Sequence, residues 1–415
     1  MKTWLYIPLM IFMLVGFHAN SQENLSQPTG IIIKLKPSAK ADNLNITSTD
    51  FTLRQIFPNA KSKARTISGV DLSRYYKIET KTKAELQSLY HTINKQKTLE
   101  WAEKSYPQEI LFIPDDPLNE SEQYYLDNIQ AWDAWDIQQG DTNVIIGITD
   151  TGIDVDHEDL LPNIAYNYTD PLDGIDNDND GYTDNFRGWD IGDNDNFPQH
   201  VLNEHGTLVS GIASAATDNG LGISGPGFNC PVLPVKISET INDSTILLTR
   251  GYEGIVYAAE HGASIINCSW GNNYYSQFAQ DMINYVVSDH DALVVASAGN
   301  NNDMRKFYPA SYDKVLSVAA TTALDEKWTP ENTGTGGGSS YGYHVDVSAP
   351  GTMMHTTEDG GGYRMVYAGT SFASPVVSGI AGLIRSEFPN LTANQTIERI
   401  KNTTDNIDTI PANIP

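Results

Sequence analysis

The chain is poor in cysteine, because its 415 residues include only Cys230 and Cys268. Two cysteines cannot supply the disulfide framework of a small disulfide-rich scaffold, so that class of protein is excluded. Each cysteine lies in an apolar segment typical of a buried strand. We therefore favour two free, buried thiols over a disulfide between them, and we expect a fold held together by its hydrophobic core.

Positive charge is also scarce, since 26 lysines and arginines stand against 52 aspartates and glutamates. The net charge of -26 argues against a surface that binds nucleic acid or an anionic membrane. This acidic balance suits an extracellular protein, or one that collects cations.

Long apolar runs are limited to one segment near the start of the chain. Residues 5–17 form a nearly apolar run that follows Lys2 and precedes smaller, polar residues. This layout is typical of a secretory signal peptide, and the run is shorter than the roughly 20 residues that a membrane helix needs. We predict a signal peptide at residues 1–20, export to the extracellular space or the cell surface, and no stable membrane insertion.

The sequence after this leader divides into two units near residue 110. In the first unit, residues 21–110, strand-like segments at 30–36 and 73–80 precede the helical pattern at 83–96, which predicts a small α+β domain. Residues 115–130 look like a polar connector.

In the second unit, residues 111–415, apolar strand segments alternate with helical segments from about residue 131 onward. The strand segments are 143–150, 231–237, 263–269, 292–298, 315–321 and 345–350, and helical segments include 208–216, 251–263 and 278–290. This alternation predicts an α/β domain with a mainly parallel sheet and helices on both faces. Sites in such sheets form at the carboxyl ends of strands, which directs attention to Asp150, Trp270 and Asn300.

Three separate motifs carry residues with catalytic potential. ITDTGID places Asp150 at the end of a buried strand, EHGTLVSG places His205 before a helix of small residues, and GTSFASPVVSG places Ser371 at another helix start. Each residue alone has an ordinary explanation as a turn, helix-start or N-cap residue. Their order along the chain, Asp then His then Ser, is one of the known orders of a triad with a serine nucleophile.

Pro375 bears on which hydroxyl of the last motif could react. Because proline has no N–H, we expect it in the first turn of a helix, where donors lack partners. The helix would then begin near Ser371 or Phe372, with Ser371 at its tip and Ser374 one turn inside. An anion that forms at Ser371 would lie in the favourable field of the helix terminus.

With these three motifs in this order, residues 120–415 closely resemble the subtilisin-like serine proteases. The resemblance implies a subtilisin-like three-layer α/β fold and a serine endopeptidase that works through an acyl-enzyme. It implies that His205 takes the proton of Ser371 and later returns it to the leaving amine, while Asp150 fixes the imidazole tautomer. Leu208 stands where the family often has a second, non-catalytic histidine.

The resemblance also implies an oxyanion hole and a substrate groove. Asn300, in the segment VVASAGNNN, falls on the family's oxyanion-hole asparagine, and the Ser371 backbone N–H would be the second donor. An extended peptide would add as a strand along 267–271 and 297–300. Trp270 favours a pocket for bulky or apolar side chains, although it could equally be core. The implied substrate-binding residues are Ser269, Trp270, Gly271, Ala298 and Gly299.

An acidic insert, DPLDGIDNDNDGYTD, spans residues 170–184. Aspartates at alternate positions followed by Gly181 match the first half of a calcium loop, although Arg187 replaces the glutamate expected at position 12. Unpaired carboxylates would repel one another, so we favour a structural Ca²⁺ site over a solvated acidic loop. The predicted ligands are Asp173, Asp176, Asp178, Asp180, Tyr182 and Asp184. The resemblance implies a second site, where Asp159 matches a family ligand and the loop near Asp218 faces it.

By position and size, residues 21–110 resemble the propeptide of these proteases, which assists folding and blocks the cleft until it is removed. The expected partners are protein or peptide substrates and the chain's own propeptide, with processing between about residues 105 and 118. A catalytically silent protease-like binding or adhesion module is the alternative function, and acyl transfer to amines is a third. Family members often continue beyond the final segment, so a missing C-terminal domain stays open.

Overall fold

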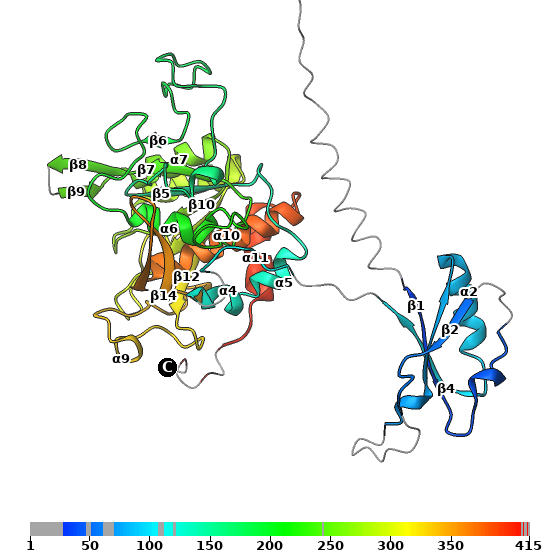
Figure 1. The fold of residues 1–415 in the computed structure, drawn as a ribbon. Helices are drawn as coiled ribbons and strands as arrows, with labels where there is room; N and C mark the ends of the chain where they lie inside the picture. The colour runs from blue at the N-terminus through cyan, green and yellow to red at the C-terminus, as the bar shows by residue number, and fades with distance from the viewer. Residues whose placement is uncertain are drawn as a thin grey trace, which may run out of the picture. The chain divides into compact units, whose positions relative to one another are not determined.

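The computed structural model describes residues 28–46, 51–60, 70–106, 112–118, 122–242, 245–407, 410 and 413. The chain separates into two compact units, Met1–Ile110 and Leu111–Pro415, and each has a hydrophobic core of its own (Figure 1). The predicted signal peptide lies outside the described residues. None of the helices in the described ranges is long and apolar enough to cross a membrane.

The first unit is an antiparallel four-stranded sheet with a helix packed on it. The strand order is β2-β3-β1-β4, with β1 at Gly30–Leu35, β2 at Phe51–Gln55, β3 at Tyr75–Thr80 and β4 at Leu99–Ser105. Helix α2, Lys83–Ile93, begins with a capping box in which Thr82 and Glu85 exchange hydrogen bonds. Its apolar face buries Leu89 and Ile93 against Ile33 of β1. The unit is therefore a small α+β fold.

The second unit is built on a seven-stranded sheet in which all neighbouring strands are parallel. The strand order is β13-β12-β11-β10-β5-β7-β6. The strands are β5 Ile145–Asp150, β6 Trp189–Asp190, β7 Val232–Lys236, β10 Ala263–Cys268, β11 Leu293–Ser297, β12 Val315–Thr321 and β13 Val347–Pro350. The central strands are buried on both faces, which explains their continuous apolar sequences.

Helices form the two outer layers of this unit. Helices α6, His205–Ser214, and α10, Thr370–Glu387, pack on each other and on the sheet, whereas α7, Gly251–Glu260, and α8, Gln277–Asp289, pack together elsewhere on it (Figure 1). Helix α11, Ala393–Thr403, contacts α10. The predicted three-layer subtilisin-like α/β fold is therefore confirmed.

The prediction of a polar connector at residues 115–130 is wrong. Helix α4, Tyr124–Asn128, buries Tyr125 and Leu126 completely, and α5 follows at Ala131–Trp135. The buried Tyr125 hydroxyl has a hydrogen-bond partner, because its O–H donates to the carbonyl of His355 at 3.1 Å. A segment rich in charged residues can therefore contribute individual side chains to the core.

Two hairpins extend the second unit beyond the predicted elements. They are β8–β9, Ser238–Asn242 with Thr245–Leu248, and β14–β15, Thr352–Glu358 with Gly362–Ala368. The second hairpin leads directly into α10. Cys230 and Cys268 are both free and buried, which confirms the interpretation that they do not form a disulfide.

Candidate active site

Asp150 ends strand β5, in the middle of the sheet, and its side chain is almost wholly buried. One carboxylate oxygen, Oδ1, accepts hydrogen bonds from the Thr151 N–H at 2.7 Å and from His205 Nδ1 at 2.8 Å. The other oxygen is buried without a partner among the described residues. The carboxylate is thus directed at one ring nitrogen of His205, which sets the imidazole tautomer with its proton on Nδ1.

His205 is the first residue of α6, where one backbone hydrogen bond is made within the preceding loop and one is made to the residue after β5. The His205 N–H donates to Asn203 Oδ1 at 2.9 Å, and the Gly206 N–H donates to Thr151 Oγ1 at 3.0 Å. A Cβ added to Gly206 would lie only 2.3 Å from the Gly152 carbonyl oxygen. The glycine after the histidine is therefore required for the helix to approach the strand end.

The pKa of His205 is set by opposing influences. Burial lowers the pKa of the imidazole, but the negative charge of Asp150 and its hydrogen bond raise it by more, so the pKa lies above the ordinary value of 6.5. His205 is still partly open to solvent, with 27% of its side chain exposed. The arrangement stabilises an imidazolium, which is the form that a general base becomes when it takes a proton.

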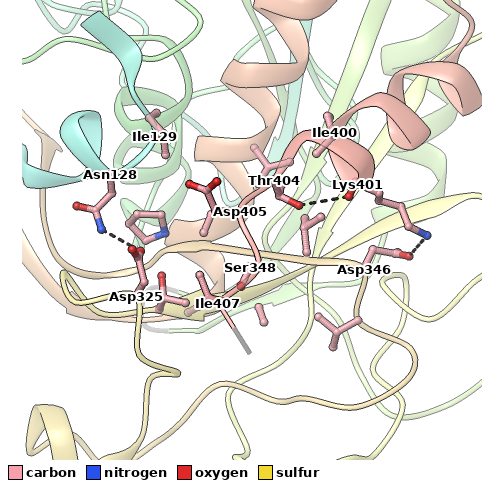
Figure 2. A pocket seen from close by; sticks show the side chains of 18 of the residues that line it. Asn128, Ile129, Asp325, Asp346, Ser348, Ile400, Lys401, Thr404, Asp405 and Ile407 are labelled. Atoms are coloured by element: carbon pink, nitrogen blue, oxygen red, sulfur yellow. Dashed lines mark hydrogen bonds and ion pairs between the residues drawn. The ribbon is translucent and has the colours of Figure 1, made fainter. Parts of the chain in front are cut away.

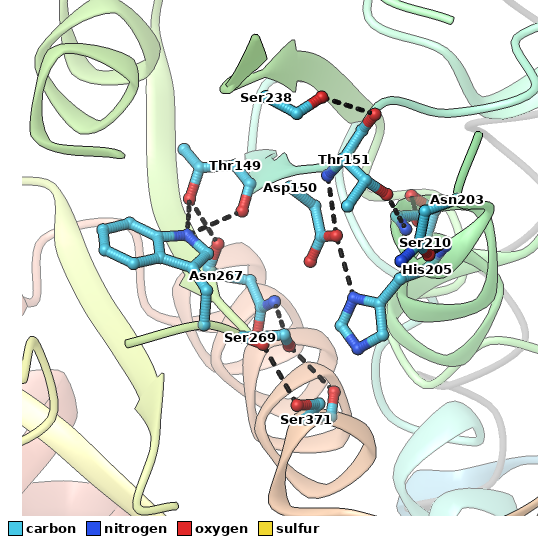
Figure 3. Close-up of polar contacts among 12 residues, drawn as sticks. Thr149, Asp150, Thr151, Asn203, His205, Ser210, Ser238, Asn267, Ser269 and Ser371 are labelled. Atoms are coloured by element: carbon cyan, nitrogen blue, oxygen red, sulfur yellow. Dashed lines mark hydrogen bonds and ion pairs between the residues drawn. The ribbon is translucent and has the colours of Figure 1, made fainter. Parts of the chain in front are cut away.

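Ser371 lies in the first turn of α10, beside this pair. Its Oγ donates to the carbonyl of Ser269 at 3.0 Å, and no hydrogen bond joins it to His205, both residues being in the described ranges. Figure 3 shows the second ring nitrogen of His205 turned toward Ser371, with Asp150 on the opposite side of the ring. The structure thus brings Asp150, His205 and Ser371 together at one edge of the sheet.

The predicted helix start is displaced by about one residue, and Pro375 lies beyond the first turn rather than in it. Helix α10 begins at Thr370 after the N-cap Gly369, so Pro375 is a proline inside the helix. A residue with an N–H at this position would donate to the Ser371 carbonyl. Ser269 supplies the missing donor, because its hydroxyl donates to that carbonyl at 2.8 Å. Proline is tolerated here because a neighbouring strand end replaces the lost helical hydrogen bond.

A buried chain of polar side chains continues beneath Ser371. Ser269 Oγ accepts from Asn267 Nδ2 and from Ser374 Oγ, both at 2.9 Å. Ser378 Oγ donates to Asn267 Oδ1 at 3.1 Å. Asn267, Ser374 and Ser378 are fully buried, so this network fixes the start of α10 against the end of β10.

Asn300 follows β11 and is oriented by Thr370. Its Oδ1 accepts from the Thr370 N–H at 2.9 Å and from Thr370 Oγ1 at 2.7 Å. Because a backbone N–H can only donate, the amide oxygen must face Thr370, which leaves Nδ2 as the free donor. The Ser371 N–H, second in the helix, has no intrahelical acceptor either. One of these two donors therefore belongs to Ser371 itself, and the other to a side chain bonded to the preceding residue, Thr370.

The predicted substrate-binding residues lie in two segments on either side of Ser371. Ser269 and Gly271 follow β10, whereas Ala298 and Gly299 follow β11. Trp270 differs from its neighbours, because its Nε1 donates to the Thr149 carbonyl at 2.9 Å. Its ring lies 5.5 Å from that of Tyr252 and against Gly251 in α7. Trp270 thus packs onto the helix layer, which matches the core alternative for this residue.

The acidic insert forms a tight loop in which three carboxylates gather. Oxygen atoms of Asp170, Asp176 and Asp178 lie within 4.8 Å of one another, and Gly181 has the positive φ of +94° expected at the sharp turn. Asp170 is fully buried and was not among the predicted ligands, although it is the first residue of the quoted insert.

The other predicted ligands have different partners. Asp180 bonds His261 Nε2 at 2.8 Å, Asp184 accepts from the backbone N–H groups of Asp173 and Gly174, and the Tyr182 ring packs on Tyr257. The Asp173 carboxylate accepts from the Ile175 N–H at 2.9 Å. These contacts leave Asp170, Asp176 and Asp178 as the carboxylates nearest to one another.

Asp159 and Asp116 form a second group of buried carboxylates. Its oxygens accept from Asn219 Nδ2 at 2.8 Å and from the Ile223 N–H at 3.0 Å, and burial raises its pKa to about 7. Asp116, which the sequence interpretation missed, accepts from the N–H groups of Asp218 and Asn219, and burial raises its pKa as well. The loop near Asp218 therefore faces both carboxylates, as expected for Asp159.

A hollow of about 730 Å³ lies between α4, α11 and the edge strand β13 (Figure 2). Asn128 pairs with Asp325 on one side, and Lys401 pairs with Asp346 on the other, at 2.8 Å. None of Asp150, His205 and Ser371 lines this hollow, so it is separate from the candidate active site.

Comparison with known proteins agrees with the fold and the geometry. Residues 141–413 match the sequence model of the subtilase family, peptidase S8. Thermitase of Thermoactinomyces vulgaris is 35% identical over 296 residues, which are 71% of this chain and 93% of that protein. A thermophilic serine proteinase of Bacillus sp. strain AK1 is 33% identical over 315 residues, 76% of this chain and 70% of that protein.

A solved structure has the same fold. A protease from Pseudoalteromonas arctica PAMC 21717 matches with a TM-score of 0.59 and 25% identity over 71% of this chain and 93% of that one. The chain therefore belongs to the subtilase family. It is a serine-type endopeptidase.

Proposed function

We propose that Ser371 is the nucleophile of this endopeptidase, with His205 as general base and Asp150 as the residue that orients it. The observation that supports this most directly is the hydrogen bond from His205 Nδ1 to the buried Asp150 carboxylate, with the other ring nitrogen turned toward Ser371. To attack, the Ser371 hydroxyl must leave the Ser269 carbonyl and donate to His205 Nε2. A rotation about its Cα–Cβ bond would release the hydroxyl from this carbonyl.

The bond changes then follow in two stages. Ser371 Oγ bonds to the substrate carbonyl carbon while its proton passes to His205, and the imidazolium returns this proton to the leaving amine. Water then attacks the acyl carbon while His205 takes its proton, and the imidazolium gives this proton to Ser371 Oγ as the C–Oγ bond breaks. Asn300 Nδ2 and the Ser371 N–H would stabilise the negative oxygen of each tetrahedral intermediate.

Calcium is proposed as a structural ion at the acidic insert. Hard oxygen donors are what Ca²⁺ prefers, and three carboxylates within 4.8 Å of one another repel unless a cation lies among them. Asp170, Asp176 and Asp178 would hold the ion. Asp159, Asp116 and the Asn219 side chain would form a second site, because carboxylates this deeply buried are costly without a cation.

We further propose that the protein is exported and made as a zymogen. The apolar leader at residues 5–17 supports export. The separate α+β unit, with its own core, supports a propeptide that inhibits the protease until cleavage between about residues 105 and 118. Its targets would be protein and peptide substrates.

The test is to express residues 21–415 with Ca²⁺, with and without Ser371→Ala. We expect the unsubstituted chain to hydrolyse casein and to separate its own first unit, and the variant to do neither at a measurable rate. Reaction with a serine-directed phosphonate, followed by mass spectrometry, should label Ser371. Equal hydrolysis by both chains would refute the proposal.

A further inference from the structure

The segments that follow β10 and β11 contain Gly271 and Gly299, and both glycines lie against the ring of Phe307. A Cβ added to Gly271 would lie 2.6 Å from Phe307 Cε1, and one added to Gly299 would lie 3.1 Å from Phe307 Cγ. The Phe307 ring therefore rests against the bare backbone of both segments. It occupies the space between the segment after β10 and the segment after β11.

This space is adjacent to Ser371. The Ser269 carbonyl, two residues before Gly271, accepts a hydrogen bond from the Ser371 hydroxyl at 3.0 Å. The Gly299 N–H donates to Thr370 Oγ1 at 3.2 Å. A substrate residue whose carbonyl carbon lies over Ser371 Oγ would direct its side chain between these two segments.

Backbone contacts hold Phe307 in place. The next residue, Tyr308, exchanges two hydrogen bonds with Asn272, of 2.7 and 2.9 Å, and so fixes the chain beside Gly271. The Phe307 N–H donates to Ser311 Oγ at 3.2 Å. A Cβ added to Gly271 would also lie 2.2 Å from the Tyr308 carbonyl oxygen, so the backbone at Gly271 and the backbone at Tyr308 are in direct contact.

We infer that Phe307 fills the primary specificity pocket, and that the enzyme cleaves after small residues such as alanine or glycine. This inference rests on the proposed role of Ser371. Glycine at 271 and 299 would ordinarily give a pocket room for a large side chain, but here the ring of Phe307 takes that room. This inference replaces the expectation, based on Trp270, of a pocket for bulky side chains.

The test compares kcat/KM for four p-nitroanilide peptides, Ala-Ala-Pro-X, with X as glycine, alanine, leucine or phenylalanine. We expect the unsubstituted enzyme to favour alanine over phenylalanine by at least about 10-fold, since fit in such a pocket is worth about 10- to 200-fold. Phe307→Ala should raise the phenylalanine-to-alanine ratio by about 100-fold. Because both rates come from one preparation, the amount of correctly folded enzyme cancels.

Phe278→Ala is the matched control, because Phe278 is 55% exposed on α8 and should leave the ratio within about 2-fold. Unsubstituted enzyme that cleaves the phenylalanine and alanine peptides equally well would overturn the inference and leave the role of Ser371 intact. This comparison does not depend on whether Phe307→Ala folds. A chain that cleaves neither these peptides nor casein would refute the proposed function, and the specificity inference with it.

Discussion

At the residue scale, the charge of Asp150 determines the pH at which His205 can act as a base. Because the pKa of His205 is raised, its ring remains protonated to higher pH, and the base form is lost as the pH falls through this raised value. We expect the acidic limb of kcat/KM to have its midpoint above 6.5. Asp150→Asn leaves only the effect of burial, so the pKa should fall below 6.5.

The His205 pKa is best measured by NMR of its ring in the Ser371→Ala background, where autolysis is absent. Asp150→Asn should also reduce kcat by about 10⁴-fold, because the imidazole is left in the wrong tautomer. An unchanged His205 pKa in the Asp150→Asn variant would contradict the role given to the carboxylate.

Asn300 offers a second prediction at this scale. Its side-chain nitrogen is free because Thr370 binds its oxygen, so Asn300→Ala removes one donor to the oxyanion. We expect kcat to fall by about 10²- to 10³-fold with little change in KM. Steady-state kinetics with Asn301→Ala as the neighbouring control would check this. A change confined to KM would point to ground-state binding instead.

At the scale of elements, the junction between the end of β10 and the start of α10 supports Ser371, the proposed nucleophile. Pro375 removes one helical hydrogen bond from the Ser371 carbonyl, and the Ser269 hydroxyl replaces it. Ser269→Ala should therefore destabilise the protein by about 1–3 kcal/mol, since it leaves a partly buried carbonyl without a donor.

In a Pro375→Ala background, the restored N–H can donate to the same carbonyl, so Ser269→Ala should cost about 1 kcal/mol less. Denaturant unfolding of the two single variants and the double variant, all carrying Ser371→Ala, gives this difference. Strictly additive effects would show that Ser269 does not compensate for the proline.

The elements that carry the site were largely predictable from the sequence, for a physical reason. Strands buried on both faces require continuous apolar runs, and the runs that end at Asp150 and Cys268 are β5 and β10. The segment at 115–130 was not predictable, because the burial of Tyr125 depends on contacts with residues more than 200 positions away. The contacts of Phe307 with Gly271 and Gly299 are likewise tertiary, and no local pattern reports them.

The proposed calcium loop was predictable only in part. Alternating aspartates and Gly181 identified the turn, but the loop closes through Asp170, whereas Asp180 binds His261 instead. Which carboxylates converge depends on how the loop folds back, and spacing alone does not determine that.

At the scale of the whole molecule, bound cations should contribute to stability. An ion at 100 times its dissociation constant adds about 2.7 kcal/mol, so chelation with EGTA should lower Tm by roughly 5 °C or more. Calorimetry of the Ser371→Ala protein avoids autolysis. A Tm that EGTA does not change would refute both calcium sites.

Variants separate the two sites. The double variant Asp176→Asn and Asp178→Asn should lose the contribution of the acidic insert, and Asp159→Asn should lose that of the second group. Asp173→Asn is the matched control, because its carboxylate caps the turn at Ile175 rather than joining the cluster. An EGTA effect reduced as much by Asp173→Asn as by the double variant would argue against the assigned ligands.

The parallel arrangement of the second unit has a consequence for the cell that makes the enzyme. Asp150, His205 and Ser371 come from strand β5 and from helices α6 and α10, which pack on each other and on the sheet, and Ser371 follows 370 residues of chain. A ribosome must therefore have synthesised all of those residues before any peptide bond inside the cell is at risk. With Ser371 as the proposed nucleophile, its late position would delay activity during biosynthesis, independent of any inhibitor.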